Sequence, residues 1–325
     1  MARRLEGVHA EAMDVRSRLY MNRWDVMPVA VASRLRTLRD VLTTGPEMHR
    51  HVVVAAIAAL ESSHRATIIS IVEAGPEYRQ RAAESITEKI AMKDALAWFA
   101  GATVTFGELV AHVVPCSSVG DMLSWLSTLL GVDAKKALAQ AANPHAVRNG
   151  TQDTEPIVRD IDKLLAALAE AFRLRHILAH EVSVDLEVSE QAARDALGAV
   201  STWVQAVDAV LWVTAFADLP LNQHEMNQHA RNGLMEARRA LARALKSARK
   251  LAIREGTSAW LRANQTAWIK ATTDWSLCTY GSLQGTMWPS VGASDLTDML
   301  RARAVQVHQW VRWQSADSDP GPLTE

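Results

Sequence analysis

A short segment in the middle of the chain brings together side chains suited to proton transfer and anion binding. It contains Arg175, His176 and His180. The two histidines are four residues apart, so they share one face of a helix. Imidazole transfers protons near neutral pH, and the planar guanidinium group of arginine holds phosphate oxygens. The segment therefore predicts proton transfer beside a bound phosphate.

The spacing between Arg175 and His180 restricts this arrangement. The two residues are five apart, so on an ideal helix their side chains point away from each other. They converge only if the arginine side chain wraps around the helix or the helix unwinds near His180. We expect this at the C-terminal end of a helix, where the helix dipole also favours cationic side chains.

The elements that must position this segment are helices. Alanine, leucine, arginine and glutamate recur at helical spacing along the chain, whereas strand and hairpin patterns are scarce. An apolar stripe after Glu155-Pro156 predicts the helix that ends in the Arg175 segment. Glycine and proline separate the other expected helices, at about 47–73, 78–99, 106–114, 119–130, 133–142, 189–217, 223–255, 257–278 and 294–313. The fold class is therefore all-α.

A metal site is the alternative reading of the two histidines. His176 and His180 have the spacing of a helical zinc pair. Glu181 follows the second histidine instead of the first, so the segment is not a HExxH motif, and no third ligand is evident nearby in the sequence. We therefore expect no metal and no cofactor.

The pattern of Arg175, His176 and His180 at the end of a helix resembles the active-site motif of the HEPN superfamily. Ala59-Leu60-Glu61 matches a second segment that is common in an early long helix of that family. The resemblance covers about residues 45–217. It implies a helical bundle that acts as a metal-independent endoribonuclease, often a toxin or phage-defence effector, with active sites at the interface of a homodimer.

The resemblance also implies roles for individual residues. His180 is the candidate general acid or base, Arg175 the phosphate clamp, and His176 a positioning or proton-transfer group. Glu61 is expected to orient a histidine or arginine across the bundle, although it could instead pair with His64 or Arg65 on its own helix. The alternative function is a non-catalytic scaffold of the HEPN type that binds RNA or dimerises.

The C-terminal part shows a second resemblance. A helix beginning near Leu221-Asn222, a Gln265-Thr266-Ala267-Trp268 helix, a glycine-containing loop and a late arginine-bearing helix look like the lysozyme-inhibitor LprI-like domain, over about 221–313. His229 occupies the position of the first cysteine of that family, and Cys278 is the only thiol in the region. The disulfides of the family therefore cannot form, and we carry over the fold but not lysozyme inhibition.

Two features of this C-terminal module bear on partners. Arg239, Arg243, Lys246 and Lys250 follow three- and four-residue spacing, so they form either an RNA-binding stripe or a solvated helix face. The tryptophans are expected mainly in the core, with base stacking or a ligand groove as the alternative; they are Trp260, Trp268, Trp275, Trp288, Trp310 and Trp313. The module is expected to sense a trigger, bind RNA or set the oligomeric state.

Composition and charge restrict the class of protein. Hydrophobic residues make up 49% and charged residues 22%, as in a globular protein. The formal net charge is −1, so any basic surface for RNA must be local. Cys116 and Cys278 form no CxxC pair, as is typical of a reducing compartment. With no signal-peptide pattern and no long uncharged apolar run, we expect a cytoplasmic protein with no membrane partner.

The two resemblances and the proline and glycine positions predict the domain organisation. We expect a helical extension at 1–45, a HEPN-like bundle at 46–218, a smaller LprI-like module at 219–313 and a flexible tail at 314–325. The partners implied are an RNA substrate, a second copy of the chain, and an antitoxin or trigger protein.

Overall fold

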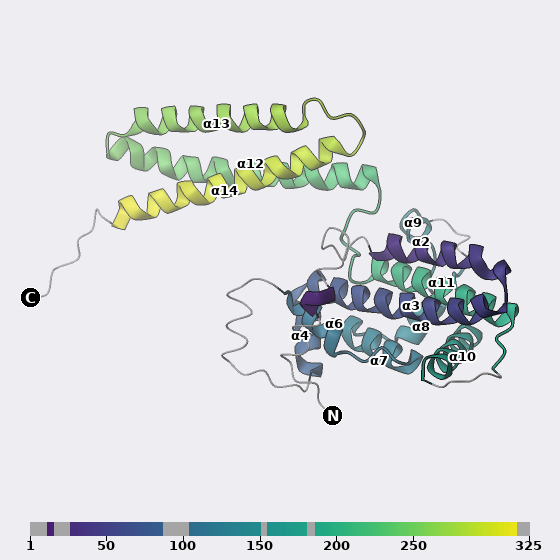
Figure 1. The fold of residues 1–325 in the computed structure, drawn as a ribbon. Helices are drawn as coiled ribbons and strands as arrows, with labels where there is room; N and C mark the ends of the chain where they lie inside the picture. The colour runs from purple at the N-terminus through teal and green to yellow at the C-terminus, as the bar shows by residue number, and fades with distance from the viewer. Residues whose placement is uncertain (1–11, 16–26, 87–103, 151–154, 181–185, 317–325) are drawn as a thin grey trace, which may run out of the picture. The chain divides into compact units, whose positions relative to one another are not determined.

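The computed structural model describes residues 12–15, 27–86, 104–150, 155–180 and 186–316, and among these residues it contains helices and no β-strand (Figure 1). The all-α fold class is thus confirmed. The chain divides into two compact units, Met1–Leu219 and Pro220–Glu325. The division lies one residue after the boundary expected from the sequence.

The first unit is built around α3 (Pro46–Ala74), which packs against α2 (Met27–Asp40), α6 (Phe106–Val113), α10 (Ile161–His180) and α11 (Glu190–Val213). Apolar side chains occur around most of α3, as expected of a helix surrounded by others. In Figure 1, α10 is seen nearly end-on, so it runs across α3 instead of along it. Side chains of α3 with no solvent exposure include Ile57, Leu60, Ile68 and Ile71.

Shorter elements complete the first unit, and side-chain caps fix where several of them begin. They are η2 (Val41–Thr44), α4 (Pro76–Ser85), α7 (Val119–Leu130), α8 (Ala134–Ala139) and α9 (Pro144–Arg148). The helix α6 starts with a capping box, in which the Thr105 hydroxyl accepts from Glu108 N and Thr105 N donates to the Glu108 carboxylate at 2.7 Å. This pairing satisfies the buried Glu108 carboxylate.

The helix α2 belongs to the core of the first unit. The sequence predicts a helical extension at 1–45 without deciding whether it joins the bundle. In the structure, Val31, Leu35, Leu38 and Leu42 are buried in the same apolar cluster as α3 and α11. Their three- and four-residue spacing gives α2 and η2 one apolar face, which packs on the bundle. The described part of this region is therefore a layer of the bundle.

The segment before α10 differs from the sequence prediction. Pro156 pairs with Ala142 in an isolated antiparallel bridge, and Ile157 N donates to Ala141 O at 2.8 Å, so this stretch is extended. The helix begins only at Ile161, where the Asp160 carboxylate accepts from Lys163 N. Ahead of this stretch, the Asn143 side chain caps the short helix α9.

Arg148, at the end of α9, ties down the end of the first unit. Its guanidinium donates to the backbone oxygens of Phe216, Ala217 and Leu219, at 3.2, 2.9 and 2.7 Å. It also lies over the Trp212 ring, 5.8 Å from the centroid. The turn after α11 is thus held by a residue almost seventy positions earlier in the chain.

Two helices of the first unit, Pro46–Ala74 and Glu190–Val213, are long and apolar enough to cross a membrane by length and composition. Their most apolar windows are 61% and 56% buried inside the unit. A helix in the core of a soluble bundle can have the same length and apolar composition as a membrane-spanning helix.

The described residues of the second unit form three helices, α12 (Gln223–Arg254), α13 (Ser258–Tyr280) and α14 (Trp288–Ala316), which lie alongside one another (Figure 1). The residues of α12 that face the core are mostly alanines, and these let α12 and α14 approach closely. Across the interface lie Leu300, Ala304 and Val307 of α14. The expected last helix, 294–313, starts earlier, at Trp288.

Candidate active site

The last turns of α10 carry the two histidines predicted to transfer protons. His176 and His180 are both exposed on one face, and their ring centroids lie 4.9 Å apart at an interplanar angle of 54°. The helix continues without interruption to His180. The unwinding that would turn His180 towards Arg175 is therefore not present in α10, and the two side chains leave the helix in different directions.

Arg175 instead reaches across the bundle to Glu61 on α3. Its guanidinium Nη2 lies 3.6 Å from Glu61 Oε2, which is an ion pair but longer than a hydrogen bond. The arginine side chain is 32% exposed and the glutamate 20% exposed, so the pair is partly shielded from water. Of the two sequence alternatives for Glu61, the structure shows the contact across the bundle.

Arg65 and Cys116 lie near the same ion pair, and neither was predicted from the sequence to belong to the site. Burial raises the pKa of the Cys116 thiol, while the charge of Arg65 and its hydrogen bond to the sulfur oppose this shift. Glu61 and Arg175 also act on the thiol through their charges. Arg65 is four residues after Glu61, so helical spacing could have placed it here. Nothing in the sequence placed Cys116.

His64 points inward from α3 and takes no part in this exposed chemistry. Its side chain is buried, and the ring Nε2 has no hydrogen-bond partner in the described structure. Burial, followed by the charge of Arg65, lowers the pKa of His64 to about 4. The ring is therefore neutral near pH 7, and it does not pair with Glu61.

The predicted basic stripe is present on α12. Arg239, Arg243, Lys246 and Lys250 are all exposed, while the opposite face of the helix is buried. None of the four forms an ion pair with another residue in the described ranges. The stripe belongs to the second unit.

The tryptophans of the second unit divide between its core and its surface. Trp268 and Trp310 pack against the apolar cluster, as predicted. Trp260, Trp275 and Trp313 are instead 52%, 55% and 68% exposed. Trp260 contacts Trp310 at 5.5 Å between ring centroids, and Trp275 Nε1 donates to Asp295 at 3.2 Å. The expectation of a mainly buried set is thus wrong for these three residues.

Within the described residues, no group of three or more His, Cys, Asp and Glu side chains is arranged to hold a metal ion. Cys116 and Cys278 are both free, and each lies in a different unit.

Comparison with known proteins identifies part of the second unit. The family described as lysozyme inhibitor LprI matches residues 217–307. These residues span α12, α13 and most of α14, so the predicted LprI-like character of this region is confirmed. No curated protein and no solved structure matches the chain.

Proposed function

We propose that the first unit is a metal-independent endoribonuclease of the HEPN type. The observation that carries the proposal is the arrangement at the end of α10, where two exposed imidazoles in contact adjoin an arginine that Glu61 holds across the bundle. These groups supply the proton-transfer and charge-neutralising chemistry that RNA cleavage needs without a metal.

The reaction is a transesterification within the RNA. The 2′-oxygen bonds to phosphorus as the bond to the 5′-oxygen breaks, which leaves a 2′,3′-cyclic phosphate and a 5′-hydroxyl end. One imidazole accepts the proton of the 2′-hydroxyl, and the other, in its protonated form, donates a proton to the leaving oxygen. His180 and His176 are assigned to these two tasks because they share an exposed helix face.

Arg175 is assigned the role of neutralising the negative charge that develops on the phosphate oxygens. The single 3.6 Å contact to Glu61 leaves room for the guanidinium to bind a phosphate as well. Glu61 then acts as a positioning residue, because it restrains a long, flexible side chain beside the histidines. In this proposal a modest rotation of Arg175 brings it towards the phosphate, in place of the helix unwinding expected from the spacing.

The wider biological role follows from the HEPN resemblance. The proposal is a cytoplasmic toxin or phage-defence effector that acts as a homodimer, with each active site completed at the interface. An antitoxin or trigger protein controls it, and the LprI-like unit senses the trigger, binds RNA or sets the oligomeric state.

The test compares RNA cleavage by the purified wild-type chain and two variants in the presence of EDTA. His180→Ala should lower the cleavage rate at least 100-fold, as expected for loss of a general acid or base. The matched control, His145→Ala, removes an exposed histidine of the same unit and should cleave like wild type. Equal rates for wild type and His180→Ala would overturn the proposal, and cleavage that EDTA abolishes would favour a metal-dependent reaction.

A second candidate function is non-catalytic RNA binding, which the stripe on α12 favours. Four exposed cations on one helix face can bind phosphates with release of counterions. The double variant Arg243→Gln/Lys246→Gln should reduce the salt dependence of RNA binding by about 1.4 in log–log slope, if both bind a single strand. The control Lys270→Gln/Arg312→Gln removes the same charge elsewhere in the unit. If it lowers the salt dependence equally, RNA binding responds to the net charge of the unit and not to the stripe.

A further inference from the structure

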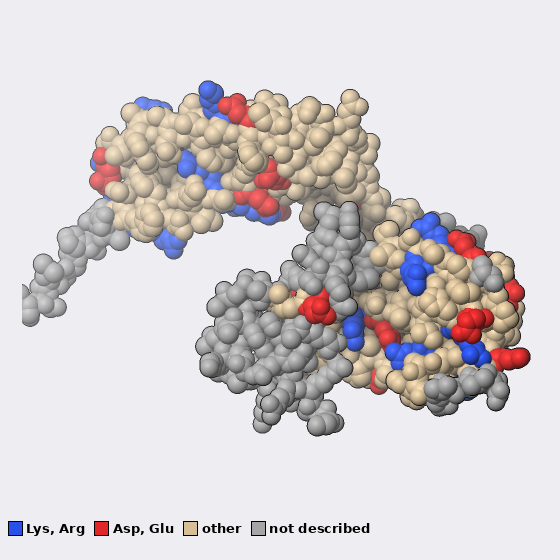
Figure 2. All heavy atoms as spheres, viewed as in Figure 1, with Lys and Arg blue, Asp and Glu red and all other residues tan. Residues whose placement is uncertain are grey.

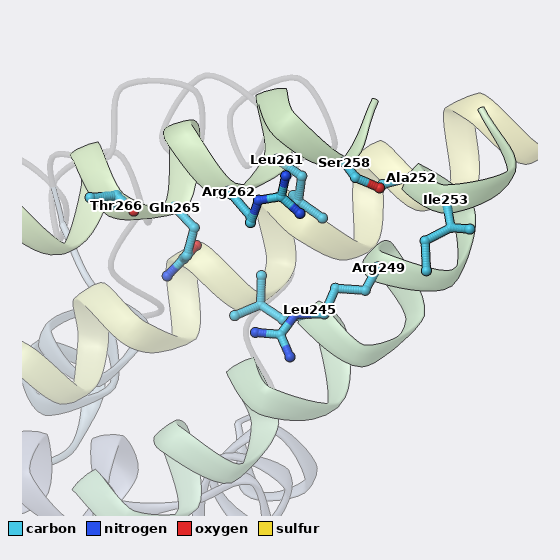
Figure 3. Close-up of a pocket in the computed structure, with 9 residues that line it drawn as sticks. All are labelled: Leu245, Arg249, Ala252, Ile253, Ser258, Leu261, Arg262, Gln265 and Thr266. Carbon is cyan, nitrogen blue, oxygen red and sulfur yellow. The ribbon is translucent and has the colours of Figure 1, made fainter. Parts of the chain in front are cut away.

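A cavity of about 380 Å³ lies between α12 and α13, close to the turn that joins them (Figure 3). Its walls include Leu245, Arg249 and Ile253 from α12 and Leu261, Arg262 and Gln265 from α13. All of its lining residues belong to the second unit. It is also remote in sequence from the α10 site.

The way in which the three helices pack explains why this space exists. Alanines at 244, 248 and 252 bring α12 close to α14. In contrast, α13 has only Leu261 and Thr272 fully buried, so it rests on the other two helices through few side chains. The turn between α12 and α13 contains Gly256 at φ +69°, a conformation that glycine adopts at little cost. Ala252 and Ser258, which line the cavity on either side of this turn, are small and fill little of the space.

The two charged groups of the cavity are both cationic. Figure 3 shows the guanidinium groups of Arg249 and Arg262 with the Gln265 carboxamide in the space between the two helices. Neither arginine has an ion-pair or hydrogen-bond partner among the residues that the structure describes. The Gln265 oxygen accepts from Arg303 Nε at 3.2 Å, which fixes that side chain. No acidic side chain lines the cavity to balance the two charges.

The rest of the lining consists of aliphatic side chains and the hydroxyl-bearing Ser258 and Thr266. Leu245, Leu261 and Ile253 contribute apolar surface beside the two guanidinium groups, and Ile253 is 74% exposed although it is a large apolar residue. On the face drawn in Figure 2, most of the surface of this unit is uncharged, with lysine and arginine in a few separate groups. Two unbalanced cations beside an aliphatic wall therefore form a distinct local environment.

We propose that this cavity binds a small amphipathic anion, which consists of a phosphate or carboxylate group on a short aliphatic chain. Arginine pairs with both headgroups through parallel hydrogen bonds, so Arg249 and Arg262 hold the anion while the aliphatic wall takes the chain. The volume lies at the lower end of the range for small-molecule sites. None of the lining residues is aromatic, so an aliphatic body fits better than a stacked nucleobase.

The experiment is a calorimetric titration of the full-length protein with four probes: hexyl phosphate, hexanoate, inorganic phosphate and hexanol. At least one of hexyl phosphate and hexanoate should bind tenfold or more tightly than both inorganic phosphate and hexanol. The tighter of the two amphipathic probes identifies the headgroup. Equal binding of hexanol, equal binding of inorganic phosphate, or no binding of either amphipathic probe overturns the proposal.

Variants locate the binding within the molecule. Arg249→Gln/Arg262→Gln should weaken binding of the tighter probe at least tenfold, whereas the charge-matched control Arg231→Gln/Arg312→Gln should leave it unchanged. All four arginines are exposed, so both variants should retain the helical circular dichroism of the wild type. If the first variant folds and binds as well as wild type, the site is not this cavity. Because binding is measured directly, the outcome is separate from any test of RNA cleavage.

Discussion

The ion pair between Glu61 and Arg175 links α3 to α10 with a strength that can be estimated. At 3.6 Å, two unit charges attract by about 1 kcal/mol in bulk water and about 5 kcal/mol at an effective dielectric constant of 20. Both side chains are partly exposed, at 32% and 20%, and ordering the arginine side chain opposes the attraction. We therefore expect a net coupling energy of about 1 kcal/mol, near the upper end for surface pairs.

A double-mutant cycle measures this coupling. Urea unfolding of wild type, Glu61→Gln, Arg175→Gln and the double variant gives the interaction energy after the separate effects of each change are removed. Glu170 and Arg173, an ion pair on the surface of α10 with side chains 53% and 55% exposed, provide the control cycle. We expect less than about 0.5 kcal/mol for that pair. A Glu61–Arg175 coupling no larger than the control would refute the reasoning, and with it the positioning role of Glu61.

Two further predictions concern stability. Because the pKa of His64 falls from 6.5 to about 4 on folding, the unfolded state binds a proton that the folded state does not. The stability contributed by the neutral ring is complete above pH 6.5 and is lost as the pH falls towards 4. Relative to His64→Leu, wild type should thus lose about 3 kcal/mol between pH 7 and 4 in urea titrations, and parallel pH profiles would contradict this. Thr105→Ala removes half of a capping box and should lower the free energy of unfolding by about 1 kcal/mol, measured by thermal unfolding. The control Thr37→Ala changes an exposed threonine and should alter that free energy by less than about 0.5 kcal/mol. Equal effects of the two variants would count against the cap.

Most helix boundaries were predictable because particular residue types mark where a helix begins and ends. Gly45-Pro46 and Gly75-Pro76 enclose α3, and the expected limits, 47 and 73, lie within one residue of the structure. Ser189 opens α11 as an N-cap in the same way. The start of α10 was not predictable from local signals, because Pro156 satisfies the rule for a first helical turn but tertiary pairing with Ala142 keeps it extended.

The candidate site was predictable in part, because helical spacing describes one helix at a time. The contact between His176 and His180 follows from their four-residue separation. The choice of Glu61 between partners on its own helix and a partner on α10 depends on how α3 and α10 cross, which spacing does not determine. Cys116 lies in a connection between helices and joins the site through packing alone. Likewise, the exposure of Trp275 reflects how loosely α13 packs.

The clamp formed by Arg148 has a practical consequence for dividing the chain. Its three acceptors, the carbonyl groups of residues 216, 217 and 219, lie after the last residue of α11, Val213. A truncated chain ending at 213 would leave a charged, partly enclosed guanidinium without these acceptors, whereas one ending at 219 would retain all three. The first unit should therefore be expressed separately as residues 1–219. Ending the chain at the last residue of α11 would remove the turn whose carbonyl groups bind Arg148.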